Sequence, residues 1–173
     1  MNIVLSILIE SIIFCTIFTL VLIFWITRER GVIGQIHNYP PKIIERVKKL
    51  GKLPEDYIEY GKKQKMICLP FFILEIIIFP IVIGRVNTFL EAWIHAYAII
   101  IIWVLYDSFI LDCLVFCQTN LFVIPGTEDM TNEYHNYWFH IKFAVIAIPI
   151  MTIVAIIPAG ITIGITYLLR KVF

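Results

Sequence analysis

Acidic and imidazole side chains lie where two apolar runs of the chain meet a polar connection. Asp107 and Asp112 stand near the end of one run, and His135 and His140 flank the start of the next. Carboxylates and imidazoles can bind a divalent metal or act as general acid and base. The pattern therefore predicts a catalytic site formed by Asp107, Asp112, His135 and His140, with Asp107, Asp112 and His140 as candidate metal ligands.

The spacing of these residues sets a condition on such a site. Residues five apart in an α-helix lie roughly 140° apart around its axis. Asp107 and Asp112 can therefore bind one ion together only if the helix is distorted or another element folds around them. The sequence contains neither His-Glu-x-x-His nor Cys-x-x-Cys, two established metal signatures. The alternative is a belt of interfacial aromatic residues, such as Tyr137 and Trp138, with solvated acids beside it.

Three further ionisable residues, Glu10, Glu75 and His95, interrupt apolar runs. The rise per residue of a helix places Glu10 and His95 at similar depth, about seven residues from the ends of their helices, with Glu75 nearer the membrane centre. An acid at mid-membrane costs about 2.5–3.5 kcal/mol, and such residues often mark function. We therefore expect a proton or ion relay formed by these residues. The alternative is that Glu10 and Glu75 are neutral acids, hydrogen-bonded to a neighbouring helix. Glu91 is already explained by a capping box with Thr88.

Long apolar runs must position these residues. Of the 173 residues, 60% are hydrophobic and 16% are charged, whereas soluble domains have about 45–50% and about 25%. Four runs are long enough to cross a hydrocarbon core of about 30 Å. We predict an all-α polytopic membrane protein with spans at about 3–27, 67–84, 88–117 and 139–169, the last being one helix kinked at Pro149 and Pro158. The chain 1–173 should form a single membrane domain.

Positive charge is concentrated between the first two spans. Ten of the 14 Lys and Arg residues lie between Arg28 and Lys65, and short cytoplasmic loops are enriched in these residues. Segments 28–66 and 118–138 are therefore predicted to be cytoplasmic, with both termini outside. The many Ile and Lys residues are typical of AT-rich bacterial genomes, so we expect a bacterial plasma membrane.

Part of this basic loop has the pattern of an amphipathic helix. Ile43, Ile44 and Val47 recur at helical spacing among Lys and Arg residues, after Pro40 and Pro41. Residues 40–65 are expected to lie along the cytoplasmic membrane surface and to contact anionic lipid headgroups. The alternative is a solvated loop. No nucleic-acid partner is expected, because the loop sits between two spans and has no recognisable nucleic-acid-binding fold.

Three functions fit these features, in decreasing order of support from the sequence. The first is a small accessory or interaction protein, with Gly160 and Gly164 forming a small-residue face suited to a homo-oligomer. The second is a membrane-embedded enzyme with a divalent metal cofactor, acting at the cytoplasmic interface on a lipid-like substrate. The third is a proton- or cation-coupled carrier, for which four spans would require an oligomer.

Overall fold

The computed structural model describes residues 2–28 and 30–172. Within them, four helical segments are long and apolar enough to cross a membrane: Ile3–Thr27, Tyr57–Gly84, Phe89–Phe116 and Thr131–Val172. The described residues form helices and connecting turns, and none of them forms a strand. The predicted all-α fold with four membrane-spanning helices is confirmed.

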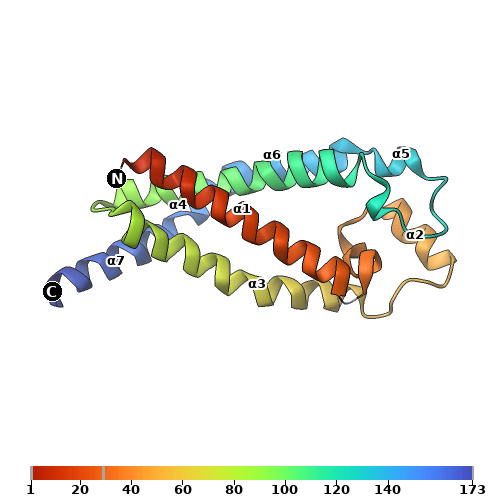
Figure 1. Ribbon diagram of the computed structural model, residues 1–173, viewed down its shortest axis with the longest axis horizontal. Coiled ribbons are helices and arrows are strands. Elements are labelled where there is room, and N and C mark those ends of the chain that lie inside the picture. The colour runs from red at the N-terminus through yellow and green to blue at the C-terminus, as the bar shows by residue number, and fades with distance from the viewer. Residues whose placement is uncertain (1, 29, 173) are drawn as a thin grey trace.

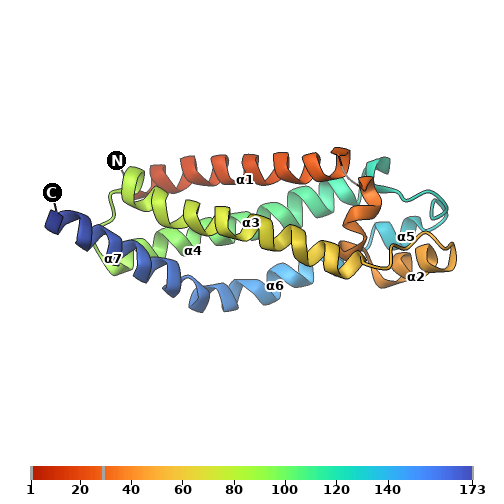
Figure 2. The same cartoon turned by 90° about the horizontal axis from the view of Figure 1, so that it is seen from below.

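The four segments alternate in direction along a long, narrow bundle. The first is α1 (Ile3–Arg28), and the second consists of α3 (Tyr57–Phe79) and η2 (Pro80–Gly84). The third consists of α4 (Phe89–Leu105) and η3 (Tyr106–Phe116), and the fourth of α6 (Tyr137–Val154) and α7 (Ile156–Val172). Figures 1 and 2 show both termini at one end of this bundle, and the segments between α1 and α3 and between η3 and α6 at the other.

Two of the segments differ from the predicted ranges. Helix α3 begins at Tyr57, ten residues before the expected position. The charged residues of this first part, such as Lys62 and Lys63, lower its hydropathy without interrupting its helix. The fourth segment extends over Thr131–Val172, beyond the expected range 139–169 at both ends. It bends at Ala155, between α6 and α7, and continues in the same direction (Figure 2), whereas Pro149 lies inside α6. Pro158 explains the bend, because a proline ring conflicts with the carbonyl group four residues before it.

Helix α4 occupies the centre of the bundle and contacts α1, α6 and α7. Small buried residues at the contacts, Ala96 on α4 and Ala155 between α6 and α7, let the backbones approach closely. On the α1 and α3 side, the rings of Phe14 and Phe72 lie 4.6 Å apart and pack near Trp103. The interior is therefore apolar over most of its length, and its few ionisable side chains stand out.

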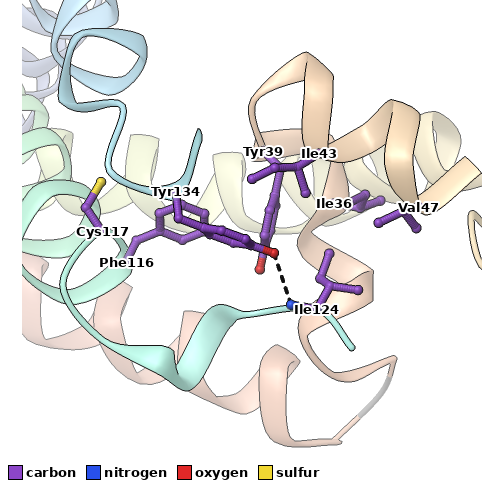
Figure 3. Close-up of a cluster of buried hydrophobic side chains, with 8 residues drawn as sticks. All are labelled: Ile36, Tyr39, Ile43, Val47, Phe116, Cys117, Ile124 and Tyr134. Atoms are coloured by element: carbon purple, nitrogen blue, oxygen red, sulfur yellow. Dashed lines mark hydrogen bonds between the residues drawn. The ribbon is translucent and has the colours of Figure 1, made fainter. Parts of the chain in front are cut away.

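Short elements form a compact cap at the end opposite the termini. They are η1 (Gly31–Asn38), α2 (Pro41–Lys49), η4 (Asn120–Phe122) and α5 (Thr131–Tyr134). Figure 3 shows the buried side chains that join them, which we call the cap cluster: Ile36, Tyr39, Ile43, Val47, Phe116, Cys117, Ile124 and Tyr134. The Tyr39 hydroxyl donates to the carbonyl of Phe122 at 2.8 Å, and the Ile124 N–H donates to the Tyr134 hydroxyl at 3.0 Å. Burial raises the pKa of Tyr39, so this side chain remains a neutral donor.

The amphipathic helix α2 packs its apolar face inside this cap. Ile43 and Val47 are fully buried in the cap cluster, so protein rather than lipid covers them. The charged face points outward, where Lys42 forms an ion pair with Glu133 and Arg46 with Asp129. Contact between this helix and lipid headgroups would therefore have to involve its charged face.

Candidate functional site

Glu10 and His95 meet in the interior of the bundle, near the end that carries the termini. Glu10 lies on α1 and His95 on α4, two helices that pack against each other. Their side chains are 0% and 1% exposed, and Nδ1 of His95 lies 3.2 Å from Oε2 of Glu10. The contact is close enough for an ion pair but is not aligned as a hydrogen bond. The prediction that these two residues lie at the same depth is confirmed.

Ser6 determines which nitrogen of the His95 ring carries a fixed proton. The Ser6 hydroxyl donates to the carbonyl of Ile3 at 2.8 Å, so its own proton is already used. It lies 3.2 Å from Nε2 of His95, and toward that atom it can only accept. This arrangement favours the tautomer that carries its hydrogen on Nε2, since the tautomer of a histidine follows from its hydrogen bonds.

With this tautomer, a single exchangeable proton on the pair can lie either on Nδ1 of His95 or on a carboxyl oxygen of Glu10. If the proton is on nitrogen, the pair is an imidazolium and a carboxylate; if it is on oxygen, both groups are neutral. The net charge of the pair is zero in both cases, which lowers the cost of burying it. The second oxygen of Glu10, Oε1, is buried and has no hydrogen-bond partner among the described residues.

Gly84 leaves the room that the His95 ring occupies. A Cβ atom at this position would lie 3.2 Å from Nε2 of His95 and 3.6 Å from the Ser6 hydroxyl oxygen. The first distance is tighter than ordinary packing, so a side chain here would push the ring away. Gly84 ends η2, a five-residue π-helical turn that begins at Pro80, and this turn brings the end of the second segment against the pair.

Glu75, the third member of the predicted relay, does not join the pair. It lies on α3, close enough for its charge to act on Glu10 and on Cys15. Its Oε1 atom is buried and has no hydrogen-bond partner among the described residues. Glu75 therefore stands as a second, separate acid in the bundle.

The cap end of the third segment is a π-helix, and this changes the geometry expected for its two aspartates. Eleven residues, Tyr106–Phe116, take this form, whereas most π-helical stretches are single turns, frequently at functional sites. In a π-helix, the N–H of a residue bonds to the carbonyl five positions earlier; the N–H of Cys117 donates to the carbonyl of Asp112 at 2.8 Å. Residues five apart follow one another by about one turn. Asp107 and Asp112 are therefore close to the same face, so the helix is distorted in the way a shared site requires.

Asp112 and His140 form a second contact between an acid and an imidazole, in which the imidazole is buried and the acid is partly exposed. Nδ1 of His140 lies 3.1 Å from Oδ2 of Asp112, with the side chains 4% and 32% exposed. Nε2 of His140 is buried and has no partner among the described residues, and the ring packs against Phe116. Asp107 lies near enough for the charges of Asp112 and His140 to act on it. These three of the four predicted residues are thus neighbours.

The fourth residue, His135, lies elsewhere. It is exposed and lines a separate polar pocket of about 450 Å³ in the cap, together with Cys117 and Glu128. Among the described residues, no three His, Cys, Asp or Glu side chains are arranged to hold a metal ion. The predicted ligand set is therefore assembled only as an acid and a histidine in contact, with Asp107 beside them.

The ionisable residues together extend along most of the bundle. The Glu10–His95 pair lies near the end of the termini, Glu75 lies on α3, and Asp107 lies toward the cap. Cys15, buried on α1, is within range of the charges of both Glu75 and Asp107. The bundle interior thus holds a series of acids with intervening gaps, rather than one isolated charge.

Three features of this arrangement, Ser6, Gly84 and the π-helix, are not among the residues and elements predicted from the sequence. Ser6 had one available signal, because it precedes Glu10 by four residues and so shares its helix face. Gly84 and the π-helix had none, since both depend on how the helices pack. No family model, curated protein or solved structure matches this chain, so the interpretation rests on the geometry.

Proposed function

We propose that the protein is a proton- or cation-coupled carrier that works as an oligomer. The observation that carries this proposal is the fully buried Glu10–His95 pair. The pair is electrically neutral when it holds one exchangeable proton, and it carries a net charge only after it releases that proton or takes up a second one. Ionisable side chains cost free energy to bury inside a membrane, and they commonly mark a proton or ion pathway.

The other acids extend the pair toward the cap. Glu75 and Asp107 lie between it and the Asp112–His140 contact, and a mobile water or a side-chain rotation would have to bridge the gaps. At one end of this series, Oε1 of Glu10 has no hydrogen-bond partner among the described residues, and at the other end Nε2 of His140 has none. These unpartnered atoms are the groups on which a proton could be handed over.

A feature of α7 supports an oligomer. Ala159 of this helix is fully buried inside the bundle, but Gly160 and Gly164 are exposed, and no atom of the described residues lies within 4 Å of a Cβ built at either. Small residues four apart allow two membrane helices to approach closely. A second copy of the chain could pack here, as the sequence predicts.

The two other functions predicted from the sequence have less support. An enzyme could use Asp112 and His140 as acid and base beside the His135 pocket, but a metal-dependent mechanism would need ligands beyond those the described residues bring together. An accessory protein gives no reason for burying Glu10 with His95. For the carrier, we propose a bacterial plasma membrane, with the cap in the cytoplasm near anionic headgroups and both termini outside.

Proton flux into vesicles tests the proposal. Purified protein is reconstituted into liposomes that contain a trapped pH-sensitive dye, and a potassium diffusion potential drives the flux. We expect flux with the wild type and its loss with Glu10→Gln, which keeps the shape of the side chain but cannot exchange a proton. Glu91→Gln is the matched control: it lies one turn from His95 on the same helix, and Gln can still form the capping box.

Three results would contradict the proposal. One is wild-type vesicles that pass no protons or cations above the level of empty liposomes. Another is flux that remains unchanged in Glu10→Gln. Equal loss in both variants would also count against the proposal, because it would indicate damage to the helix end rather than removal of a proton site.

A further inference from the structure

An apolar groove of about 590 Å³ lies between α1 and α3 and contains Glu75. Its sides come from residues 17–25 of α1 and residues 67–79 of α3. Ile17, Leu74 and Ile78 line it and are 43, 52 and 48% exposed. The groove is therefore open at the side of the bundle, where the lipid would lie.

The lining combines aromatic rings with a single acid. Five of its twelve residues are aromatic: Phe24, Trp25, Phe71, Phe72 and Phe79. The described lining includes no Lys, Arg or His, so Glu75 has no cationic side chain beside it. Its Oε1 atom is buried without a hydrogen-bond partner. An acid in this position lacks the counter-charge that an anion in a low-dielectric environment requires.

We propose that this groove binds a lipophilic organic cation, such as a hydrophobic ammonium ion, which enters from the bilayer and pairs with Glu75. Aromatic faces attract organic cations, and more strongly where water is excluded. The acid supplies the charge, and the remaining side chains match an apolar body. Transport of this cation as a substrate rests on the proposed carrier function. Binding of the cation to the groove does not, because binding does not use the Glu10–His95 proton.

Neutral lipid is the main competitor for this space. An acyl chain would fit the apolar lining but would leave the Glu75 oxygen without a partner, since it offers neither a donor nor a charge. A cation satisfies both parts of the groove. Charge complementarity therefore favours the cation over an ordinary lipid tail.

Equilibrium binding of tetraphenylphosphonium to the purified protein in a neutral detergent tests this inference. We expect saturable binding to the wild type, with one probe per groove. In Glu75→Gln the affinity should fall by about tenfold or more, as expected for loss of a desolvated charge pair. Glu59→Gln is the matched control, because Glu59 is an exposed acid on the same helix and its removal should leave binding unchanged.

A second probe and a second variant keep the test decisive. Tetraphenylborate has the same shape and the opposite charge, and should not bind saturably. Ile78→Trp should block the groove without altering its charge, which covers the case in which Glu75→Gln fails to fold. Ile153→Trp, at an exposed position on α6, should bind as the wild type does.

The inference is overturned by equal binding to the wild type and Glu75→Gln, by equal binding of the borate and the phosphonium, or by the absence of saturable binding. Proton flux without phosphonium binding would reject only the groove. Phosphonium binding without any proton flux would reject only the carrier function. The two proposals can therefore fail separately.

Discussion

Replacing Glu10 and His95 by leucine, separately and together, separates the packing role of the pair from its chemical role. Leucine is apolar and of similar size, so each substitution removes polar atoms without leaving a large cavity. In Glu10→Leu, Nδ1 of His95 loses the atom that lies 3.2 Å away. In His95→Leu, Oε2 of Glu10 loses the same contact, and neither carboxyl oxygen has a hydrogen bond among the described residues to replace it. Each single variant therefore leaves one buried polar group without the polar atom that faces it in the wild type.

The expected losses of stability follow from these unpaired polar groups. Leaving one buried polar group unsatisfied costs about 1–3 kcal/mol, whereas replacing both partners by apolar groups can be nearly neutral. We expect each single variant to lose about 1–3 kcal/mol of stability and the double variant to lie within about 1 kcal/mol of the wild type. Ser6 does not add a penalty when His95 is removed, because its hydroxyl still donates to the carbonyl of Ile3.

Reversible unfolding in mixed micelles, followed as denaturing detergent is added, measures these differences. The four proteins form a double-mutant cycle, which isolates the interaction between the two residues. Strong non-additivity is the expected result. If the two single losses simply add in the double variant, or if neither single variant is destabilised, the two side chains do not depend on each other and the assigned pairing is wrong.

Substitutions at Gly84, His37 and Tyr39 test the packing and hydrogen bonds described above. Gly84→Ala should shift the His95 ring and destabilise the protein by about 1–3 kcal/mol through overpacking. The same unfolding assay measures this loss. A loss below a few tenths of a kcal/mol would mean that the ring moves aside freely. Burial lowers the pKa of His37 in the folded cap, so the folded state binds a proton less readily than the unfolded state. The stability of the protein should therefore fall as the pH drops below the ordinary His pKa of 6.5. A His37→Gln variant should show a flatter pH dependence of stability, and an equally steep one would exclude this cause. Tyr39→Phe should cost about 1–3 kcal/mol, because the carbonyl of Phe122 loses its buried donor; hydrogen exchange in the cap should rise in parallel, and unchanged exchange would contradict this.

Much of the fold follows from local signals in the sequence. Apolar runs identify the four spans, and Thr88 with Glu91 forms the capping box expected at the start of α4. The helical spacing of Ile43 and Val47 matches the buried face of α2. These features depend on neighbours in the chain, which is why the sequence is informative about them.

The parts that could not be predicted depend on contacts between distant segments. Similar depth placed Glu10 near His95, but the choice of Nε2 as the protonated nitrogen needs the position of Ser6. The angle of roughly 140° between Asp107 and Asp112 holds for an α-helix. In the π-helix that the chain forms here, the two residues lie close to the same face. The apolar face of α2 was expected on lipid, and only the fold shows that the cap cluster covers it.

We propose that the Glu10–His95 pair holds an exchangeable proton that the carrier uses. Proton flux through the Glu10→Leu/His95→Leu double variant tests it most directly, because that protein is expected to fold about as well as the wild type. Flux should be present in wild-type and Glu91→Gln vesicles and absent in those with the double variant. A folded double variant that passes protons as fast as the wild type would contradict the account.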